Sequence, residues 1–258
     1  MKRRVSCMLM LAAALATPQV FAQAAAPAAA SDVANPVDPR AVAALQKMGA
    51  YLQSLRRFSV STDLTGERVL ADGQKLQHTA TARLDVDRPN KIRAVLSSAR
   101  NEREIIFNGK NVTLYTPAQK YYSTVQFDGT IGALIDKLRD NYGVEFPLSD
   151  LFAWGTPEAP TDQFESAMFA GQDYIGPVLC DHYAFRQKAV DWQIWISAGA
   201  NPLPRKIVIT RRDDDARPQS VSILDWSAHA SFKDSEFTFS PPTGAKKIEI
   251  VPVATNKG

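Results

Sequence analysis

Short runs of alternating apolar and polar residues, separated by turn residues, are the feature that most restricts how this chain can fold. In residues 58–64 (FSVSTDL) and 76–86 (LQHTATARLDV), every second side chain except His78 is apolar or small. Successive side chains of a strand point to opposite faces of a sheet, so this pattern predicts strands with one dry and one wet face. Asp72-Gly73 lies between the two runs and is typical of a hairpin turn.

The same pattern continues through residues 91–97 and 105–125. The second of these segments, IIFNGKNVTLYTPAQKYYSTV, contains three strand-like runs that turn at Asn108-Gly109 and around Pro117-Ala118. Six or seven consecutive strands joined by short turns predict an antiparallel meander. Beyond Gly171 the strands return, over residues 178–187, 191–197, 204–212 and 219–227.

Helical periodicity is confined to a few segments. Residues 38–57 predict an amphipathic helix with Asp38 as N-cap, Pro39 at its first position and Arg56-Arg57 at its C-terminus. A second helix follows Thr130, and residues 147–155 predict a further helical turn. These helices are too few for a parallel βαβ fold. We therefore predict a mainly β (α+β) fold, in which one strongly curved antiparallel sheet forms a half-open barrel with an N-terminal helix and helical lid segments.

The N-terminus has the pattern of an export signal. Lys2, Arg3 and Arg4 precede a short apolar stretch over residues 5–16, which predicts a secretory signal peptide over residues 1–24. The apolar stretch is too short to span a membrane, so we expect no transmembrane segment in the mature chain. Residues 25–37 predict a disordered Ala/Pro-rich tether, residues 38–252 a single domain, and residues 253–258 a C-terminal tail.

Loss of the leader changes both charge and cysteine content. The whole chain has 30 Lys and Arg residues and 27 Asp and Glu residues, and removing the three basic leader residues leaves 27 of each. A formally neutral mature chain gives no electrostatic reason to expect a nucleic-acid partner. Removing Cys7 also leaves Cys180 without an internal disulfide partner.

The sequence contains no pattern that predicts a catalytic residue, a metal site or a cofactor. The motifs G-x-S-x-G, H-E-x-x-H and G-x-G-x-x-G and the phosphate-binding loop are absent. The one local cluster is Cys180-Asp181-His182. On a strand Cys180 and His182 share a face, which allows a soft-metal pair or an activated thiol, and equally a packed Cys beside a hydrogen-bonded His.

Aromatic residues give a further indication in DWQIWIS, residues 191–197. Trp192, Ile194 and Ile196 share one face of the predicted strand, whereas Gln193 and Trp195 share the other. A strand with aromatic side chains on both faces is either covered on both sides or lines a cavity on one side. Core packing alone explains the pattern equally well.

Two segments resemble known families. Residues 180–210 (CDHYAFRQKAVDWQIWISAGANPLPRKIVIT) resemble a family of predicted periplasmic proteins of unassigned function, over roughly residues 38–242. Residues 105–125 are similar in pattern to the LolA/LolB-type lipoprotein carriers, with Gly109, Tyr115 and Pro117 in the matching places of their hairpin. The resemblance implies a periplasmic location and an incomplete antiparallel barrel around a hydrophobic cavity with a helical lid.

From these observations we expect a non-catalytic periplasmic binding or carrier protein for a lipid or lipid-modified ligand. An envelope protein or a lipoprotein is a candidate partner. The predicted cavity-lining residues, which should share one face of the sheet, are Leu64, Leu84, Leu96, Leu114, Trp192 and Ile194. Two alternatives remain open. One is a periplasmic enzyme or a redox or metal protein that uses Cys180, Asp181 and His182, and the other is an envelope-assembly adaptor without a ligand.

Overall fold

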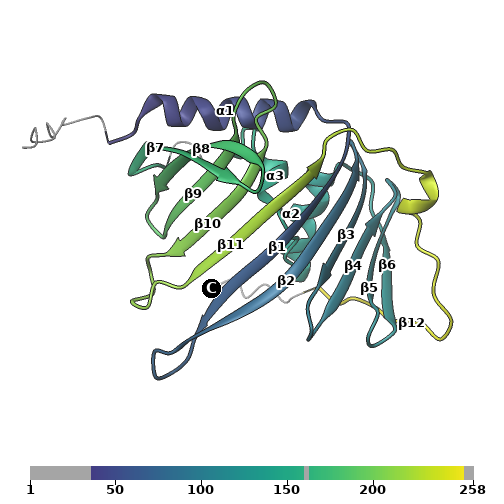
Figure 1. Cartoon of the computed structure of the whole chain (residues 1–258). Helices are drawn as coiled ribbons and strands as arrows, with labels where there is room; N and C mark the ends of the chain where they lie inside the picture. The colour runs from purple at the N-terminus through teal and green to yellow at the C-terminus, as the bar shows by residue number, and fades with distance from the viewer. Residues whose placement is uncertain (1–35, 160–162, 253–258) are drawn as a thin grey trace, which may run out of the picture. The chain divides into compact units, whose positions relative to one another are not determined.

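Twelve strands form one sheet in the computed structural model, which describes residues 36–159 and 163–252 (Figure 1). The strands are β1 (Arg57–Val69), β2 (Lys75–Asp87), β3 (Lys91–Ser97), β4 (Glu102–Phe107), β5 (Asn111–Thr116), β6 (Tyr121–Gln126), β7 (Ser166–Ile175), β8 (Val178–Arg186), β9 (Val190–Ser197), β10 (Pro204–Arg211), β11 (Gln219–Ser227) and β12 (Lys246–Lys247). The helices are α1 (Pro39–Ser54), α2 (Ile131–Tyr142), α3 (Asp150–Ala153) and the 3-10 helix η1 (Asp234–Phe237).

The strand order is β12-β6-β5-β4-β3-β2-β1-β11-β10-β9-β8-β7. Strands β1 to β6 form the predicted meander, β7 to β11 form a second one, and the pairing of β1 with β11 joins them. Neighbouring strands are antiparallel except β12 and β6, which are parallel. The predicted mainly β fold with an antiparallel sheet is confirmed.

The turn predicted at Asn108-Gly109 shows why these strands reverse where they do. The Asn108 side-chain oxygen accepts hydrogen bonds from the backbone N–H groups of Lys110 at 3.0 Å and Asn111 at 2.9 Å. Gly109 has a φ of 89°, which glycine adopts without the steric cost that a side chain would bring. Local hydrogen bonding and a left-handed residue therefore fix the β4–β5 hairpin.

One helix boundary and one strand differ from the sequence prediction. The first helix ends at Ser54, and Arg57 is already the first residue of β1, so Arg56-Arg57 do not lie in the helix. Strand β7 was not predicted as a separate strand. Its sequence SAMFAGQDYI has adjacent apolar residues at Met168 and Phe169, and a bulge between Phe169 and Gly171 shifts the register. Both features remove the regular alternation on which the prediction depended.

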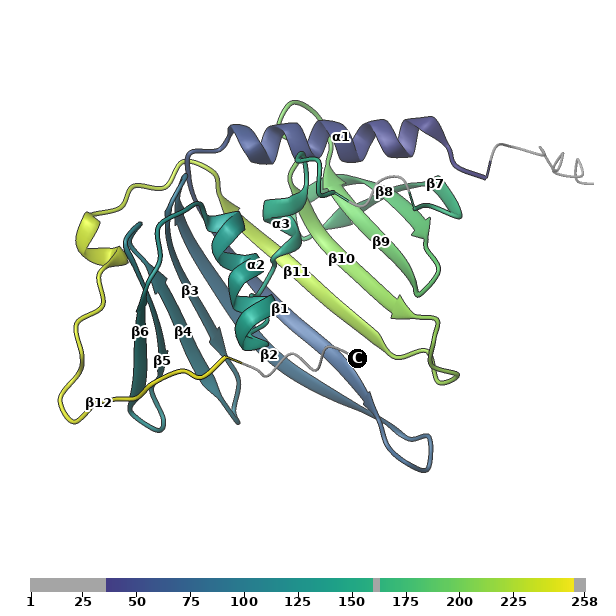
Figure 2. The ribbon, with the colours of Figure 1, turned by 180° about the vertical axis from the view of Figure 1, so that it is seen from behind.

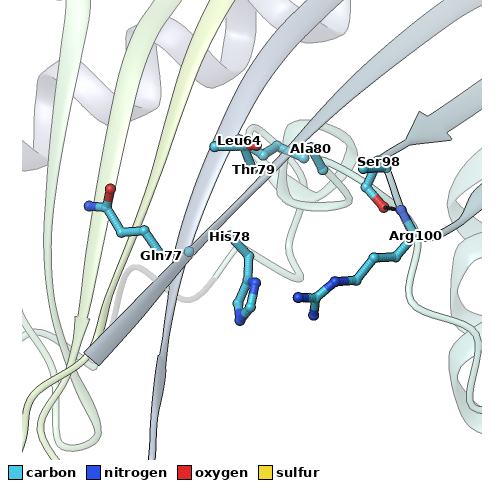
Figure 3. A pocket seen from close by; sticks show the side chains of 9 residues that line it. Leu64, Gln77, His78, Thr79, Ala80, Ser98 and Arg100 are labelled. Carbon is cyan, nitrogen blue, oxygen red and sulfur yellow. Dashed lines mark hydrogen bonds between the residues drawn. The ribbon is translucent and has the colours of Figure 1, made fainter. Parts of the chain in front are cut away.

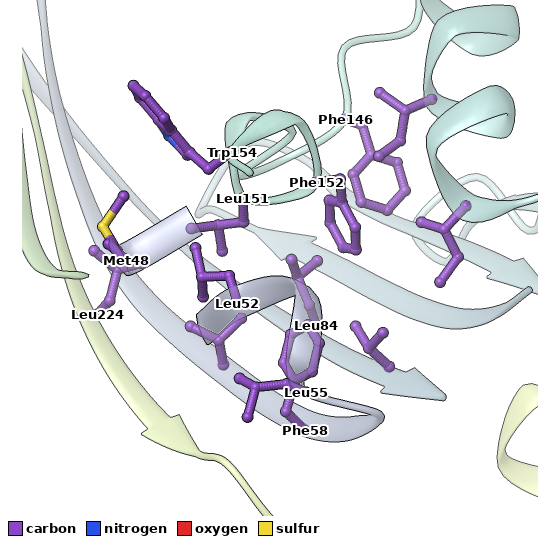
Figure 4. Close-up of a cluster of buried hydrophobic side chains, with 14 of the residues drawn as sticks. Met48, Leu52, Leu55, Phe58, Leu84, Phe146, Leu151, Phe152, Trp154 and Leu224 are labelled. Atoms are coloured by element: carbon purple, nitrogen blue, oxygen red, sulfur yellow. The ribbon is translucent and has the colours of Figure 1, made fainter. Parts of the chain in front are cut away.

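All three α-helices contribute to one core against a single face of the sheet, and Figure 2 shows them on the same side of it. Leu45, Met48 and Leu52 of α1 are at most 1% exposed. Leu134 and Leu138 of α2 are equally buried. Figure 4 shows side chains from α1, α3 and the sheet meeting in this main core, among them Leu52, Phe58, Leu84, Leu151 and Phe152. We call this helix-covered side the inner face.

The start of α1 is fixed by a cap and by the sheet edge. As predicted, Asp38 is the N-cap and accepts a hydrogen bond from the Arg40 backbone N–H at 2.8 Å. The Asp38 N–H donates to the carbonyl of Ala167 in β7 at 2.9 Å, and the Ala167 N–H donates to the carbonyl of Pro36 at 2.8 Å. The chain before the helix is therefore bonded to one end of the sheet.

Helix α1 and the chain after α3 come into direct backbone contact at Gly49 and Gly155, which have no side chains to separate them. A Cβ atom built on Gly49 would lie 2.5 Å from the backbone N of Gly155, and Gly155 has a φ of 81°. Beside this contact, Gln53 Nε2 donates to the carbonyl of Trp154 at 2.7 Å. We call this contact of Gly49, Gln53, Trp154 and Gly155 the glycine seam. It holds α3 close to α1.

The segment after β11 covers part of the outer face and one sheet edge. The Phe239 ring lies 5.3 Å from the ring of Tyr115 and 5.1 Å from that of Tyr122. Further on, the Ile248 N–H donates to the Tyr122 carbonyl at 2.8 Å, alongside the β12–β6 pairing. The backbone of β6 is therefore occupied on both sides at this position.

The predicted signal peptide (1–24), almost all of the predicted tether (25–37) and the predicted tail (253–258) lie outside the described residues. Within residues 36–159 and 163–252, the helices are too short or too polar to cross a membrane.

Candidate functional site

The pairing of the strands puts all six predicted lining residues on the inner face. Leu84 pairs with Ala94, Ala94 with Ile105, and Ile105 with Leu114. On the other side, Leu64 pairs with Ser222, which pairs with Ile207, and Ile207 pairs with Ile194. Directly paired residues share a face, so the residues selected by alternation lie on one face across eight strands, from β5 to β9.

A first cavity lies between α3 and strands β9 and β10. Its volume is about 210 Å³, and we call it the tryptophan recess. Its lining residues are Asp150, Ala153, Trp154, Gln187, Val190, Trp192, Ile194, Ile207 and Ile209. Apolar side chains dominate this list, and Trp192 and Ile194 are two of the six predicted residues. The two side chains of this lining that carry a carboxylate or an amide are those of Asp150 and Gln187.

A second cavity adjoins the first. Its volume is about 230 Å³, and we call it the leucine recess. Its lining residues are Leu64, Leu96, Ser222, residues 145–151 and, shared with the tryptophan recess, Ile207 and Ile209. Leu64 and Leu96, two more of the predicted residues, are half-buried here. The stretch from Glu145 to Trp154, which we call the α2–α3 segment, therefore covers two adjoining apolar recesses at the middle of the sheet.

Trp192 belongs both to the core and to the wall of the tryptophan recess. Its ring stacks on Phe185 at 4.3 Å with an interplanar angle of 18°, and lies 5.6 Å from the Trp154 ring. Its Nε1 donates to the Gln187 side-chain oxygen at 3.1 Å. Truncation of Trp192 would remove these packing contacts as well as recess surface, so it cannot separate stability from binding.

The other two predicted residues occupy different surroundings. Leu84 is 0% exposed and packs inside the main core (Figure 4). Leu114 is half-buried and packs against the edge of that core. Both share the inner face with the recesses, and their contact with a ligand stays a prediction.

Asp150 is the ionisable residue that borders both apolar recesses. It is the first residue of α3, and its carboxylate makes no hydrogen bond or ion pair with the described residues. Surrounding protein withdraws water from the carboxylate, and this desolvation raises its pKa above the ordinary value. Its accessible surface opens into the recesses that it lines.

A third hollow lies on the same face nearer the tip of the β1–β2 hairpin. Its volume is about 470 Å³, and its lining includes Leu64, which it shares with the leucine recess. Figure 3 shows the side chains of His78 and Arg100 extending into this hairpin recess. The inner face thus changes from apolar beneath the helices to polar towards the hairpin.

Several lining residues were missed from the sequence. Ile207 and Ile209 alternate in PRKIVITRR and could have been assigned to the inner face by the rule that identified Ile194. Trp154 and Asp150 lie in the segment PLSDLFAWG, where only a short helical turn was predicted. No sequence signal shows that this turn lies over β9 and β10.

Cys180 and His182 lie on the outer face, away from the recesses. His182 Nε2 bonds to the Gln193 side-chain oxygen at 3.0 Å, and its ring stacks on Trp195 at 4.0 Å. Cys180 is 0% exposed and packs with Trp195 and Val208 in a second small cluster. Burial raises the pKa of the Cys180 thiol, which opposes the formation of a reactive thiolate.

Metal-binding geometry is likewise absent from the part of the chain that the structure describes, where no three His, Cys, Asp or Glu side chains are grouped to hold an ion. The Cys180–His182 pair therefore matches the packing interpretation of the sequence, with a buried Cys beside a hydrogen-bonded His.

Three solved structures illustrate what this chain is similar to. LprF from Mycobacterium bovis has 14% identity and a TM-score of 0.45, with 81% of this chain and 99% of that chain covered. The Mycobacterium tuberculosis lipoprotein LppX has 11% identity and a TM-score of 0.42, with 75% of this chain and 98% of that chain covered. A LolA superfamily protein from Nitrosomonas europaea has 12% identity and a TM-score of 0.29, with 77% of this chain and 97% of that chain covered. At these identities and TM-scores, the similarities carry no conclusion about what this chain binds.

Sequence comparison assigns the family. No curated protein sequence matches the chain. A family model described as "Predicted periplasmic protein (DUF2092)" matches residues 41–251, which is most of the chain and nearly all of the described part. The resemblance to a family of predicted periplasmic proteins is thereby confirmed. The chain belongs to the DUF2092 family of predicted periplasmic proteins.

Proposed function

We propose that this protein is a non-catalytic periplasmic binding or carrier protein for a lipid or another hydrophobic ligand. The observation that carries the proposal is the pair of adjoining apolar recesses between the inner face and the α2–α3 segment. Together the recesses reach the lower end of the roughly 300–1,000 Å³ typical of small-molecule pockets. A single slender apolar group, such as one acyl chain, fits this size better than a bulky ring system does.

The lining supplies the driving force for such a ligand. Each methylene group transferred from water into an apolar site contributes about 0.8 kcal/mol. Ile207 and Ile209 are half-buried and border both recesses, so a chain crossing from one recess to the other would cover them. Binding of such a chain to the shared wall of the two recesses needs no catalytic group.

We further propose that the sheet is the strongly curved wall of a half-open barrel and that the helices are its lid. Supporting this, the strand order ends in β12 and β7, which do not pair with each other among the described residues. The sheet is therefore not closed by hydrogen bonds, while α1, α2 and α3 all cover its inner face. A ligand would enter by displacement of the α2–α3 segment.

One observation favours an envelope-assembly adaptor as a second candidate function. Beyond Ala167, strand β7 has no neighbour on its outer side among the described residues, and Met168, Phe169 and Tyr174 are 55%, 40% and 71% exposed. An open strand edge with exposed apolar side chains can pair with a strand of another protein. The enzyme alternative at Cys180 has no comparable support.

The test of the carrier function fills the tryptophan recess. Ala153 of α3 is half-buried and lines it, so Ala153→Leu adds apolar volume inside the recess without removing a core contact. We expect at least a tenfold loss of affinity for a fluorescent fatty acid, with an unchanged or higher melting temperature. The matched control is Ala43→Leu on the exposed side of α1, which should leave both quantities unchanged.

Lipid mass spectrometry on the native protein gives an independent measurement. Protein that carries no lipid and binds no apolar fluorophore would contradict the carrier proposal. Empty protein that co-purifies with a stable partner through the β7 edge would instead support the adaptor.

A further inference from the structure

Arg88 follows the last residue of β2 and lies between two aromatic rings. Its guanidinium carbon is 5.9 Å from the centroid of the Phe58 ring and 5.4 Å from that of the Phe152 ring. Its Nε and Nη2 are buried and have no hydrogen-bond partner within the described residues. The remaining nitrogen, Nη1, has accessible surface and is likewise without a bonded acceptor there.

This environment leaves a positive charge without a negative partner. Arginine stays protonated in proteins, so it cannot avoid the cost of burial by losing its proton. Burial is the one cause that lowers the Arg88 pKa, and no carboxylate opposes it. The two ring faces offset part of the lost hydration, but they supply no hydrogen-bond acceptor.

Arg88 borders a hollow that is larger than the tryptophan, leucine and hairpin recesses. This arginine recess has a volume of about 1210 Å³ and lies between the C-terminal end of α1, Pro89, α2 and α3. The first turn of α2 also borders it, from Thr130 to Ala133, where the helix dipole favours negative charge. The Ile131 N–H donates to the Pro89 carbonyl and the Ala133 N–H to Thr130 Oγ1, so among the described residues the Gly132 N–H is the donor of this turn that is left for an anion. Two independent features of the recess therefore attract an anion.

Most carboxylates of the arginine recess already have partners. Asp136 and Asp140 bind Arg139, with N–O distances of 2.8 Å and 2.9 Å. Glu158 has its pKa lowered by hydrogen bonds, first that with Thr156. Asp150 is the exception: its carboxylate has no hydrogen-bond or ion-pair partner among the described residues, and desolvation raises its pKa.

We propose that the arginine recess is an anion-binding site that receives the oxygen atoms of a phosphate or a carboxylate, with Arg88 as its central residue. The Nη1 nitrogen donates to the ligand, and the delocalised charge of the guanidinium is compensated through the low-dielectric surroundings. Asp150 and Ala153 line both the arginine recess and the tryptophan recess. The site goes beyond the proposed function, since it would bind a free anion as well as the headgroup of an amphiphile.

The experiment measures binding of inorganic phosphate and of dodecyl phosphate by calorimetry at constant ionic strength. Arg88→Met should weaken binding of both anions at least tenfold, and Arg88→Lys should restore most of the loss because it restores the charge. Arg68→Met is the matched control. It makes the same change in net charge at an exposed position outside the recess, and it should leave both affinities unchanged. Asp150→Asn should tighten binding.

The outcomes distinguish a free anion from an amphiphile headgroup, and they test the anion site separately from the carrier function. Dodecyl phosphate that binds at least tenfold tighter than inorganic phosphate identifies an amphiphile headgroup, whereas equal affinities identify a free anion. Equal losses in Arg88→Met and Arg68→Met, or no binding of either anion, would overturn the anion site. Binding of a neutral apolar fluorophore should survive Arg88→Met, so failure of the carrier proposal is observed separately.

Discussion

Asp150 lines the tryptophan, leucine and arginine recesses, and its ionisation affects all three. Asp150 is an exposed residue, but the protein around its carboxylate displaces part of the hydrating water. A carboxylate with no cationic partner in such a place is less stable than the same carboxylate in the unfolded chain. Its folded-state pKa is therefore raised, which means that the folded protein holds the proton more tightly than the unfolded one. The folded state is then favoured at low pH and loses this advantage as pH rises through the folded pKa.

Asp150→Asn should for this reason raise the melting temperature at neutral pH. The gain should shrink as pH falls and vanish well below the ordinary Asp pKa of about 3.9, where Asp150 is protonated in both states. Thermal melts of the two proteins across this pH range measure the effect. Asp136→Asn is the control, since it removes a carboxylate bound to Arg139 and should not produce a gain at neutral pH. A pH-independent difference for Asp150→Asn would contradict the explanation.

The recess residues differ in how far the sequence could predict them. Leu64, Leu96, Trp192 and Ile194 were assigned to one face by alternation, and the pairing confirms that face. Their selection as cavity residues rather than core residues did not follow from the pattern, as Leu84 shows. Arg88 could not be predicted at all, because its lack of an acceptor depends on where Phe58 and Phe152 are in three dimensions.

At the scale of elements, the glycine seam fixes the position of α3 relative to α1. The added Cβ of Gly49 would come within 3.0 Å of backbone atoms of Gly155, a separation that real Cβ atoms essentially never show. Because α3 covers both apolar recesses, a displacement at the seam would be transmitted to the recess walls.

Gly49→Ala should therefore destabilise the protein by about 1–3 kcal/mol, the range typical of overpacking a tight contact. The melting temperature should fall by several degrees, at about 2–4 °C per kcal/mol for a protein of this size. Gly66→Ala is the control, because a Cβ there has no neighbouring atom within 4 Å. A thermal melt compares them, and a Gly49→Ala protein as stable as the Gly66→Ala protein would show that the seam can open without cost.

Elements with regular periodicity were predicted well, and irregular ones were not. Strands β1 to β6 and helices α1 and α2 follow from alternation, turn residues and the caps at Asp38 and Thr130. Strand β7 was missed because its bulge breaks the alternation, and β12 because two residues carry no pattern. The parallel pairing of β12 with β6 and the pairing of β1 with β11 are long-range choices that local sequence does not encode.

At the scale of the whole molecule, the two edges of the sheet differ in how far other parts of the chain cover them. Strand β6 is covered at its edge by β12 and the following residue Ile248. Strand β7 is bonded to the chain before α1 at Ala167 and has exposed apolar side chains beyond it. An edge with free backbone groups is where unrelated chains associate, so covering β6 limits self-association on that side.

Ile248→Pro should expose the β6 edge, because proline lacks the N–H that donates to the Tyr122 carbonyl. The lost hydrogen bond should cost about 0.5–1.5 kcal/mol, and light scattering should detect concentration-dependent self-association. Ile248→Ala retains the N–H and is the matched control. Since Ile248 is 46% exposed, this control should change little. Identical behaviour of the two variants would show that the side chain, and not the backbone bond, matters there.

The glycine seam also has a genetic consequence. In an ordinary packing pair, enlarging one side chain can be compensated by shrinking the other. A methyl group at Gly49 would instead meet the backbone of Gly155, which already has no side chain to lose. A second-site suppressor of a change at Gly49 therefore cannot arise at position 155. It would have to move α1 or α3 as a whole, so the two glycines should be replaceable in related chains only where the spacing of these helices has also changed.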